Sequence, residues 1–163
     1  MGCSEAGGPE TEYPLLTARV DGATWTREPD DLLVAWLTPA GYLFVGGNRN
    51  DSLGRARDGL GVLVFGFVGP GEYQLTPDTD DEGFFTLYNP ATSGATNFFS
   101  TSGVLTVTDW DSAGRRVAGR FSFEAREHGG TREVTVTNGA FRVEYDTIGP
   151  GGEAITDLSP VGH

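Results

Sequence analysis

The chain has 163 residues and a net charge of −12, because 23 acidic residues outnumber 11 basic ones, all of which are arginine. This length suits one domain with a core of its own. An acidic surface repels phosphate backbones, which argues against nucleic-acid binding. There is no apolar run of about 18 residues that could span a membrane. Cys3 is the only cysteine, so we expect a monomeric domain stabilised by packing and sheet hydrogen bonds.

The first residues carry a localisation signal. Gly2 followed by Cys3 is what a lipoprotein signal peptide leaves at its cleavage point, and residues 4–12 are polar, as a tether should be. We therefore expect a signal peptide that ends before Cys3, a lipid on Cys3, and a tether over residues 1–13. This places the protein in the cell envelope, anchored to the outer membrane, in the periplasm or at the cell surface. The alternative is an incidental cysteine in a polar tail.

Short segments rich in valine, leucine, aromatic residues and threonine follow the tether, separated by turn signals. None of them shows helical periodicity over three turns, so they are predicted to be strands. The predicted strands are Leu15–Val20, Thr24–Arg27, Leu32–Leu37, Tyr42–Gly46, Val62–Val68, Tyr73–Leu75, Phe84–Tyr88, Asn97–Ser100, Leu105–Asp109, Val117–Arg126, Glu133–Thr137 and Phe141–Tyr145.

The connections between these strands are predicted from turn chemistry. Asp21-Gly22 indicates a tight hairpin, Asn138-Gly139 indicates a turn, and residues 47–58 form a polar loop. Strand Val117–Arg126 alternates apolar and polar residues with a period of two, which is typical of a half-buried antiparallel strand. The same pattern in the last two strands predicts a shared core that holds Phe121, Phe123, Val134, Val136, Phe141 and Val143. The fold class is therefore all-β with little helix: an antiparallel meander forming a β-barrel or a β-sandwich, with a lipocalin-like barrel favoured. The domain spans residues 14–146, and residues 147–163 form a loose tail.

Three motifs carry a family resemblance. They are Val20-Asp21-Gly22-x-x-Trp25, the strand Val117–Phe123, and the ending Val134–Phe141. The chain resembles a family of uncharacterised lipoproteins from Bacteroidota and related bacteria, in which a lipobox cysteine precedes a polar tether and one all-β domain. The resemblance spans about Leu15 to Tyr145. Arg120 stands where that family usually carries a small polar residue. The resemblance implies the location and the architecture, but it supplies no site, because no reaction is assigned to the family.

An acidic segment resembles half of a calcium loop. Asp78, Asp80 and Glu82 precede Gly83, as in the first half of an EF-hand loop. Position 12 of such a loop falls on Asn89, which cannot supply the closing bidentate carboxylate. We therefore weigh a calcium site on these three residues against a solvated turn. The turn is favoured, and no cofactor is expected.

Aromatic residues are the candidates for ligand recognition. Exposed aromatic rings on a rigid sheet stack on sugars or contact partners. The candidate ligand-binding residues are Trp25, Trp36 and Trp110, accompanied by Tyr42, Tyr73 and Tyr88, and core packing is the alternative for each. We expect Trp110 to point away from the Leu105 face. Of the adjacent Phe98 and Phe99, one must face outward.

Catalytic constellations are scarce. His128 and His163 are the two histidines, no nucleophile elbow occurs, and the Asp109 and Asp111 pair is interpreted as part of a turn. We therefore expect no enzyme and no catalytic residues. The leading hypothesis is a lipid-anchored, non-enzymatic envelope domain that binds a ligand, a protein or a glycan. The others are an accessory subunit of an envelope complex and a carbohydrate-binding or glycan-processing module assisted by calcium. A filled interior with an exposed aromatic patch would favour partner or glycan binding over small-ligand carriage.

Overall fold

The computed structural model describes residues 14–29 and 31–147. Strands make up 66% of these residues and no helix occurs among them, which confirms the all-β prediction. Accordingly, the described part holds no helix long and apolar enough to cross a membrane. The strands are β1 (Leu15–Val20), β2 (Ala23–Thr26), β3 (Leu33–Leu37), β4 (Leu43–Asn50), β5 (Ala56–Val64), β6 (Gly71–Gln74), β7 (Glu82–Asn89), β8 (Gly94–Asp111), β9 (Arg116–Glu127), β10 (Glu133–Glu144) and β11 (Asp146–Thr147).

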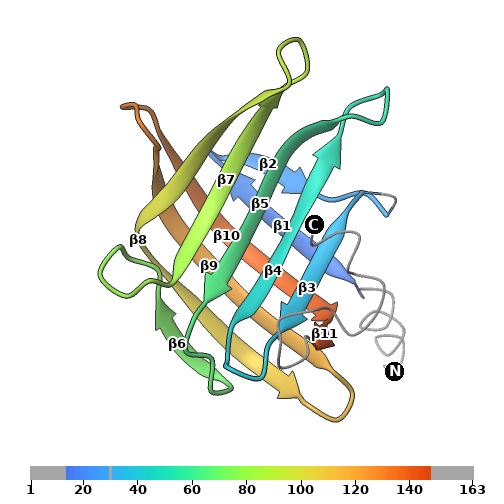
Figure 1. Ribbon diagram of the computed structural model, residues 1–163, viewed down its shortest axis with the longest axis vertical. Helices are drawn as coiled ribbons and strands as arrows, with labels where there is room; N and C mark the ends of the chain where they lie inside the picture. The colour runs from blue at the N-terminus through green and yellow to red at the C-terminus, as the bar shows by residue number, and fades with distance from the viewer. Residues whose placement is uncertain (1–13, 30, 148–163) are drawn as a thin grey trace, which may run out of the picture.

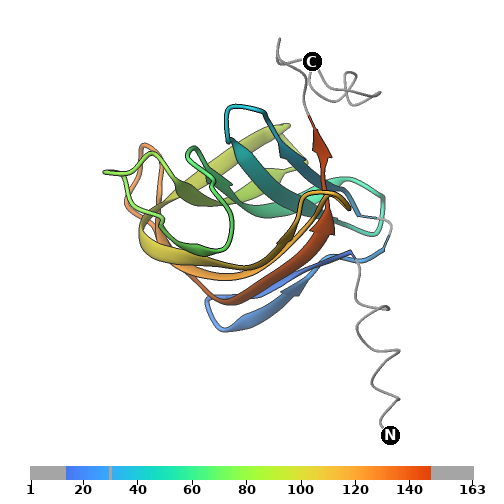
Figure 2. The same ribbon diagram turned by 90° about the horizontal axis from the view of Figure 1, so that it is seen from below.

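All the strands belong to one sheet, in the order β11-β3-β4-β5-β7-β8-β9-β10-β1-β2, with β6 paired to β8 (Figure 1). The sheet curls into a half-barrel. Figure 2 shows it from below, with the β1–β2 hairpin opposite β4 and β5 across the interior. Neighbouring strands are antiparallel, as the meander predicts, except for the short parallel pair of β11 and β3. Because all strands share one sheet, the sandwich alternative is not what the chain forms.

The predicted alternation sets which residues fill the interior. In β9 and β10, buried residues alternate with more exposed ones except at Ala118, which is also buried, and at the irregularity between Val136 and Gly139. Both strands contribute to one hydrophobic core. The six side chains predicted to be buried together all belong to it: Phe121, Phe123, Val134, Val136, Phe141 and Val143. Arg120, on the opposite face of β9, is exposed. A shift of either strand by one residue would expose its whole apolar set, so the register is firmly specified.

The Asp21-Gly22 hairpin is confirmed. Asp21 and Gly22 have φ angles of 51° and 84°, and Val20 pairs with Ala23 across the turn. Two successive positive φ angles define the type I′ turn that suits the twist of a two-residue hairpin. The side chain of Asp21 also accepts a hydrogen bond of 2.8 Å from the backbone N–H of Thr135, which fastens the hairpin to β10.

The Asn138-Gly139 turn is a wrong prediction, because these residues form a bulge inside one long strand. The register with β9 shifts between Val136 and Gly139, and Asn138 has a φ of 55°. Asparagine followed by glycine tolerates positive φ in a bulge as readily as in a turn. The same correction joins the two segments predicted at Asn97–Ser100 and Leu105–Asp109, which are both part of β8. The chain therefore has fewer, longer strands than predicted.

The segment predicted as a polar loop over residues 47–58 is largely strand. β4 continues to Asn50 and β5 begins at Ala56. β5 ends at Val64, before the predicted end at Val68. These strands were not predicted because each carries a charged residue that faces inward: Arg49 on β4 and Asp58 on β5, which form an ion pair. Each charge is neutralised by the other, so burial is tolerated.

The ends of the chain need one correction. Thr147 lies in β11, whereas the predicted domain ends at residue 146. The expected lipidation site Cys3 and the tether over residues 1–13 lie outside the described residues, and so does the predicted tail beyond residue 147.

Candidate functional site

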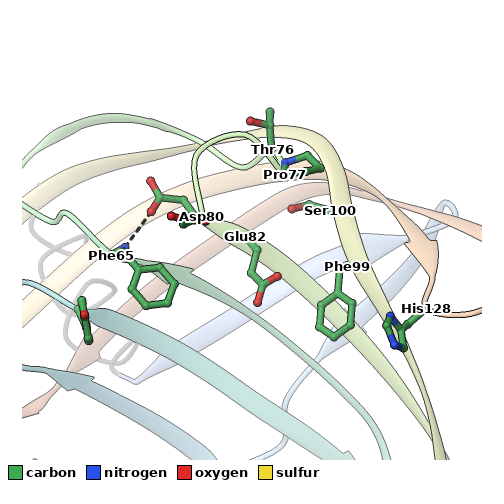
Figure 3. Close-up of a pocket in the computed structure, with 10 residues that line it drawn as sticks. Phe65, Thr76, Pro77, Asp80, Glu82, Phe99, Ser100 and His128 are labelled. Carbon is green, nitrogen blue, oxygen red and sulfur yellow. Dashed lines mark hydrogen bonds between the residues drawn. The ribbon is translucent and has the colours of Figure 1, made fainter.

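The main candidate site is an open groove of about 810 Å³ on the outer face of the half-barrel, here called the outer groove (Figure 3). It combines aromatic rings with carboxylates. Its lining residues are Tyr42, Phe65, Thr76, Pro77, Asp80, Asp81, Glu82, Phe99, Ser100 and His128. Figure 3 shows the Glu82 side chain between the rings of Phe65 and Phe99, with His128 beyond Phe99.

Strand alternation explains why aromatic rings face outward here. Phe98 is buried in the core, and its neighbour Phe99 points to the opposite face, as predicted for this pair. Phe99 lies directly across from Phe84 on β7. The ring of His128 meets the Phe99 ring edge-on, with centroids 5.8 Å apart. Phe99 is thus held between neighbours, with its outer surface lining the groove.

A second aromatic pair lies at the other end of the groove. The rings of Tyr42 and Phe65 meet edge to face, with centroids 4.8 Å apart at 77°. Tyr42 precedes β4 and Phe65 follows β5, and these strands are neighbours because Leu43 pairs with Val64. Both rings stay partly exposed. The groove therefore has aromatic surfaces at both ends and carboxylates between them.

The loop between β6 and β7 supplies the carboxylates. Leu75 is fully buried and anchors the start of the loop, and the hydroxyl of Thr79 donates to the carbonyl oxygen of Gln74 at 2.7 Å. Asp81 accepts a hydrogen bond of 2.8 Å from the backbone N–H of Phe65. These bonds fix the loop against the end of β5. Asp80 has a φ of 68°, which aspartate tolerates better than most residues.

Burial makes two of these carboxyls weaker acids than usual. Loss of solvent raises the pKa of Asp81, the Phe65 N–H partly offsets that rise, and the charge of Asp80 adds to it. Loss of solvent also raises the pKa of Glu82. Both carboxyls would gain from a hydrogen-bond donor or a cation in the groove, because either stabilises the ionised form. Chemically, the groove offers hydrogen-bond acceptors beside aromatic surfaces.

Trp110 lies at one end of the interior, and its predicted direction is wrong. A bulge between Val107 and Asp109 changes the register of β8, so that Trp110 pairs with the buried Val117 and shares its inward face. The indole N–H donates to the hydroxyl of Tyr145 at 2.9 Å. The indole also packs edge to face on Phe67 at 5.1 Å, and 37% of its surface remains exposed. Trp110 therefore closes this end of the half-barrel.

Trp25 closes the opposite end of the interior and is only 1% exposed. Its indole N–H donates to Asp58, which also accepts two hydrogen bonds from the guanidinium of Arg49. Arg49 lies over the indole ring at 5.2 Å from its centroid. Trp25 therefore has a core role and offers no surface to an external ligand. This network was missed because Arg49 and Asp58 fall in the predicted loop.

Trp36 is on the outer face, partly buried. It stacks on Phe44 with centroids 5.3 Å apart, and Phe44 stacks on Phe84 at 5.7 Å. This row of rings crosses β3, β4 and β7 and leads to Phe99, the direct partner of Phe84. Trp36 therefore extends the aromatic surface beside the outer groove, although it does not line the groove itself.

The acidic segment contributes to the groove rather than to a closed loop. Asp80 and Glu82 line the groove, and Asp78 does not. Among residues 14–29 and 31–147, no three acidic, histidine or cysteine side chains are grouped so that they could hold a metal ion. Asp111 accepts a hydrogen bond from the N–H of Gly114 at 3.0 Å, which agrees with its interpretation as a turn residue.

From the sequence, Asp80 and Glu82 are candidates for calcium and Tyr42 is a candidate for recognition, whereas Phe65 is not predicted to belong to a site. One sequence signal for the groove is the alternation that places Phe99 on the outer face when Phe98 is buried. Tyr42 and Phe65 each stand next to an inward-facing strand residue, so period-two alternation directs both outward. The pairing of their strands, which brings the two rings together, could not be inferred from local pattern.

Comparison with known families identifies the domain. The family model described as a domain of unknown function (DUF6252) matches residues 13–143. The chain belongs to this family. No match was found among curated proteins or among solved structures. Membership in DUF6252 agrees with the predicted uncharacterised family of one domain, and the matched range covers β1 to β10 almost entirely.

Proposed function

We propose that this DUF6252 domain is a non-enzymatic binding domain of the cell envelope that holds its ligand in the outer groove. The observation that carries the proposal is the juxtaposition of Phe65 and Phe99 with Glu82 in that groove. Binding sites combine apolar and aromatic surface with a few polar groups that fix orientation. The outer groove has this composition and is held by the fold.

The packing of the interior supports binding on the outside. The core side chains from all the long strands are buried together, and Trp25 and Trp110 close its two ends. In the interior, phenylalanine rings lie directly against glycines that have no side chain to occupy the space. A methyl group added to Gly139 would lie 2.4 Å from the Phe121 ring, and one added to Gly83 would lie 2.4 Å from the Phe123 ring. Such close packing favours an external ligand over one carried inside.

A glycan is the second, more specific candidate. Aromatic rings stack on the apolar faces of sugars, and carboxylates accept hydrogen bonds from sugar hydroxyls. Glu82 lies between two rings in the groove, which suits this chemistry. Hydrolysis of a glycoside would require two carboxyls that face each other across the scissile bond. The described acids of the groove gather on one short segment, residues 80–82, which favours binding over turnover.

The anchor is the second part of the proposal. We infer that Cys3 carries a lipid and that residues 4–13 connect it to the folded domain. The support is the Gly2-Cys3 junction and the polar composition of the segment that follows it. Globomycin, which blocks lipoprotein maturation, should make the precursor accumulate in the native host. Unchanged maturation in its presence would contradict the anchor and leave the groove unaffected.

A panel of glycans and envelope proteins tests the groove. Phe99→Ala removes a groove ring, and we expect it to abolish or greatly weaken any binding that the wild type shows. Leu53→Ala is the matched control, because Leu53 is exposed in the loop between β4 and β5, outside the groove. Equal binding by wild type and Phe99→Ala, with the fold intact, would contradict the proposal. Turnover of any panel member would contradict its non-enzymatic part.

A further inference from the structure

Exposed hydrophobic side chains gather at one end of the half-barrel. Among the described residues, six large hydrophobic side chains are exposed, and four of them belong to the strand ends and loops of this end: Tyr42, Phe65, Val68 and Trp110. The loops that carry the first three follow β3 and β5, at the lower end in Figure 1. We call these four residues the apolar rim.

The rim is held rigidly. The hydroxyl of Tyr73 donates to the carbonyl oxygen of Gly69 at 2.6 Å and accepts from the N–H of Val68 at 3.1 Å. The N–H of Phe67 donates to the carbonyl oxygen of Gly41 at 2.9 Å, which joins the two loops. Val68 is nevertheless 83% exposed. The hydrogen bonds therefore fix the loop that carries Val68, while the side chain of Val68 itself stays in solvent.

The chain enters the domain at this same end. Leu15 at the start of β1 pairs with Arg142, Arg142 pairs with Ala118, and Ala118 pairs with Asp109, the neighbour of Trp110. The row of cross-strand partners therefore connects the first residue of β1 to the rim. An anchor attached to the chain before β1 would therefore lie on the same side of the domain as the rim.

The length of the tether limits how far the rim lies from an anchor. Residues 4–13 separate Cys3 from the described domain. An extended chain of this length spans about 35 Å and a flexible one about 18 Å. We propose that the apolar rim docks on the headgroup region of the lipid bilayer that holds Cys3. This proposal rests on the anchor proposed above.

The chemistry of the rim fits a zwitterionic bilayer surface. Tryptophan and tyrosine favour the membrane interface, where the ring meets acyl chains and the polar edge meets water. Asp109 and Asp111 flank Trp110, and the whole chain carries a net charge of −12. Anionic headgroups would repel these charges. We therefore expect docking on phosphatidylcholine or phosphatidylethanolamine, with weaker docking as anionic lipid is added.

Vesicle partitioning of the full chain with Cys3→Ser tests the rim without any lipid anchor. Phosphatidylcholine vesicles should bind this protein, and Val68→Asp should weaken partitioning by about tenfold, because an exposed carboxylate cannot enter the interface. Leu53→Asp is the matched control: Leu53 is 72% exposed in the β4–β5 loop, away from the rim, and should leave partitioning unchanged. Both variants should keep the far-ultraviolet circular dichroism of the parent, because both side chains are in solvent.

Brominated phosphatidylcholine supplies a second readout. In a Trp36→Phe background it should quench the fluorescence of Trp110 on binding, because the remaining Trp25 is buried in the core. Equal partitioning of Val68→Asp and its parent, or no partitioning at millimolar lipid, would overturn the proposal. Concentration-dependent dimerisation that Val68→Asp abolishes, without vesicle binding, would overturn it in favour of a second copy. Because these proteins carry no lipid, the outcome is independent of the globomycin test.

Discussion

The indole N–H of Trp25 donates a hydrogen bond of 2.8 Å to Oδ1 of Asp58, across the interior of the half-barrel from β2 to β5. The same carboxylate accepts hydrogen bonds from Nε and Nη2 of Arg49, at 2.9 and 2.8 Å. One buried acid therefore joins β2, β4 and β5. This bond connects an edge of the sheet to its middle, so it helps to set how tightly the sheet curls.

Asp58→Ala should destabilise the domain by about 3 kcal/mol, because it leaves the Arg49 charge and the Trp25 N–H without their acceptor. Chemical denaturation measures the change. Glu144→Ala is the control, because it removes an exposed acid paired with Arg116 at 3.5 Å, and such pairs contribute less than about 1 kcal/mol. Equal losses in both variants would show that the buried network contributes no more than a surface pair.

Gly61→Ala should destabilise the domain by about 2 kcal/mol, because the added methyl group would lie 2.5 Å from the carbonyl oxygen of Val45 and 2.6 Å from the Phe84 ring. Gly66→Ala is the matched control. Nothing lies within 4 Å of its added methyl group, so its melting temperature should match or slightly exceed that of the wild type. A neutral Gly61→Ala would mean that the aromatic row over β5 is loosely packed.

The raised pKa of Glu82 predicts a pH-dependent stability. Burial raises this pKa above its ordinary 4.5, so the folded state binds the proton more tightly than the unfolded state. The stabilising contribution is complete below pH 4.5 and is lost as pH rises through the folded pKa. Glu82→Gln does not ionise, so its melting temperature should rise relative to wild type between pH 3 and pH 7. The change is small, because the side chain of Glu82 is only partly buried and solvent screens its charge.

Glu127→Gln should show the opposite trend in the same thermal scans. A hydrogen bond from Arg132 lowers the pKa of Glu127, so its contribution is present above 4.5 and is lost as pH falls through the folded pKa. Its melting temperature relative to wild type should therefore fall from pH 3 to pH 7. Parallel trends for the two variants would contradict the assignment of burial as the cause at Glu82.

Calcium should produce no specific stabilisation. The segment around Asp80 lacks a closing carboxylate at Asn89, and an ion that does not bind the folded state cannot raise its melting temperature. Thermal scans of the wild type and of Asp80→Ala with and without millimolar calcium test this. A rise in the wild type that Asp80→Ala abolishes would establish a calcium site in the outer groove.

The sequence predicted those parts of the fold that depend on local alternation. Phe121 and Phe123 lie in the core because period-two patterning is a local property of a half-buried strand. Alternation does not predict bulges. Asn138-Gly139 has the composition of a turn but lies inside β10. One extra residue near Asp109 changes the register of β8 and turns Trp110 inward. Bulges depend on the partner strand, which a single sequence does not name.

The candidate site was predicted only in fragments. Asp80 and Glu82 were identified as an acidic turn, and Phe99 was recognised as one of a pair that must split between faces. Their meeting with Phe65 depends on the hydrogen bond from its N–H to Asp81, which joins residues 16 positions apart. Contacts of this kind are set by sheet topology, which local composition does not determine.

In the proposed function, ligand binds outside the half-barrel, in the outer groove. A nuclear magnetic resonance titration with a library of monosaccharides and small aromatic fragments tests it most directly, read from side-chain signals. Bound fragments should shift the ring signals of Phe65 and Phe99 and leave the methyl signals of the buried Leu60 and Val62 unchanged. Shifts concentrated at Leu60 and Val62, with the groove rings unaffected, would contradict it.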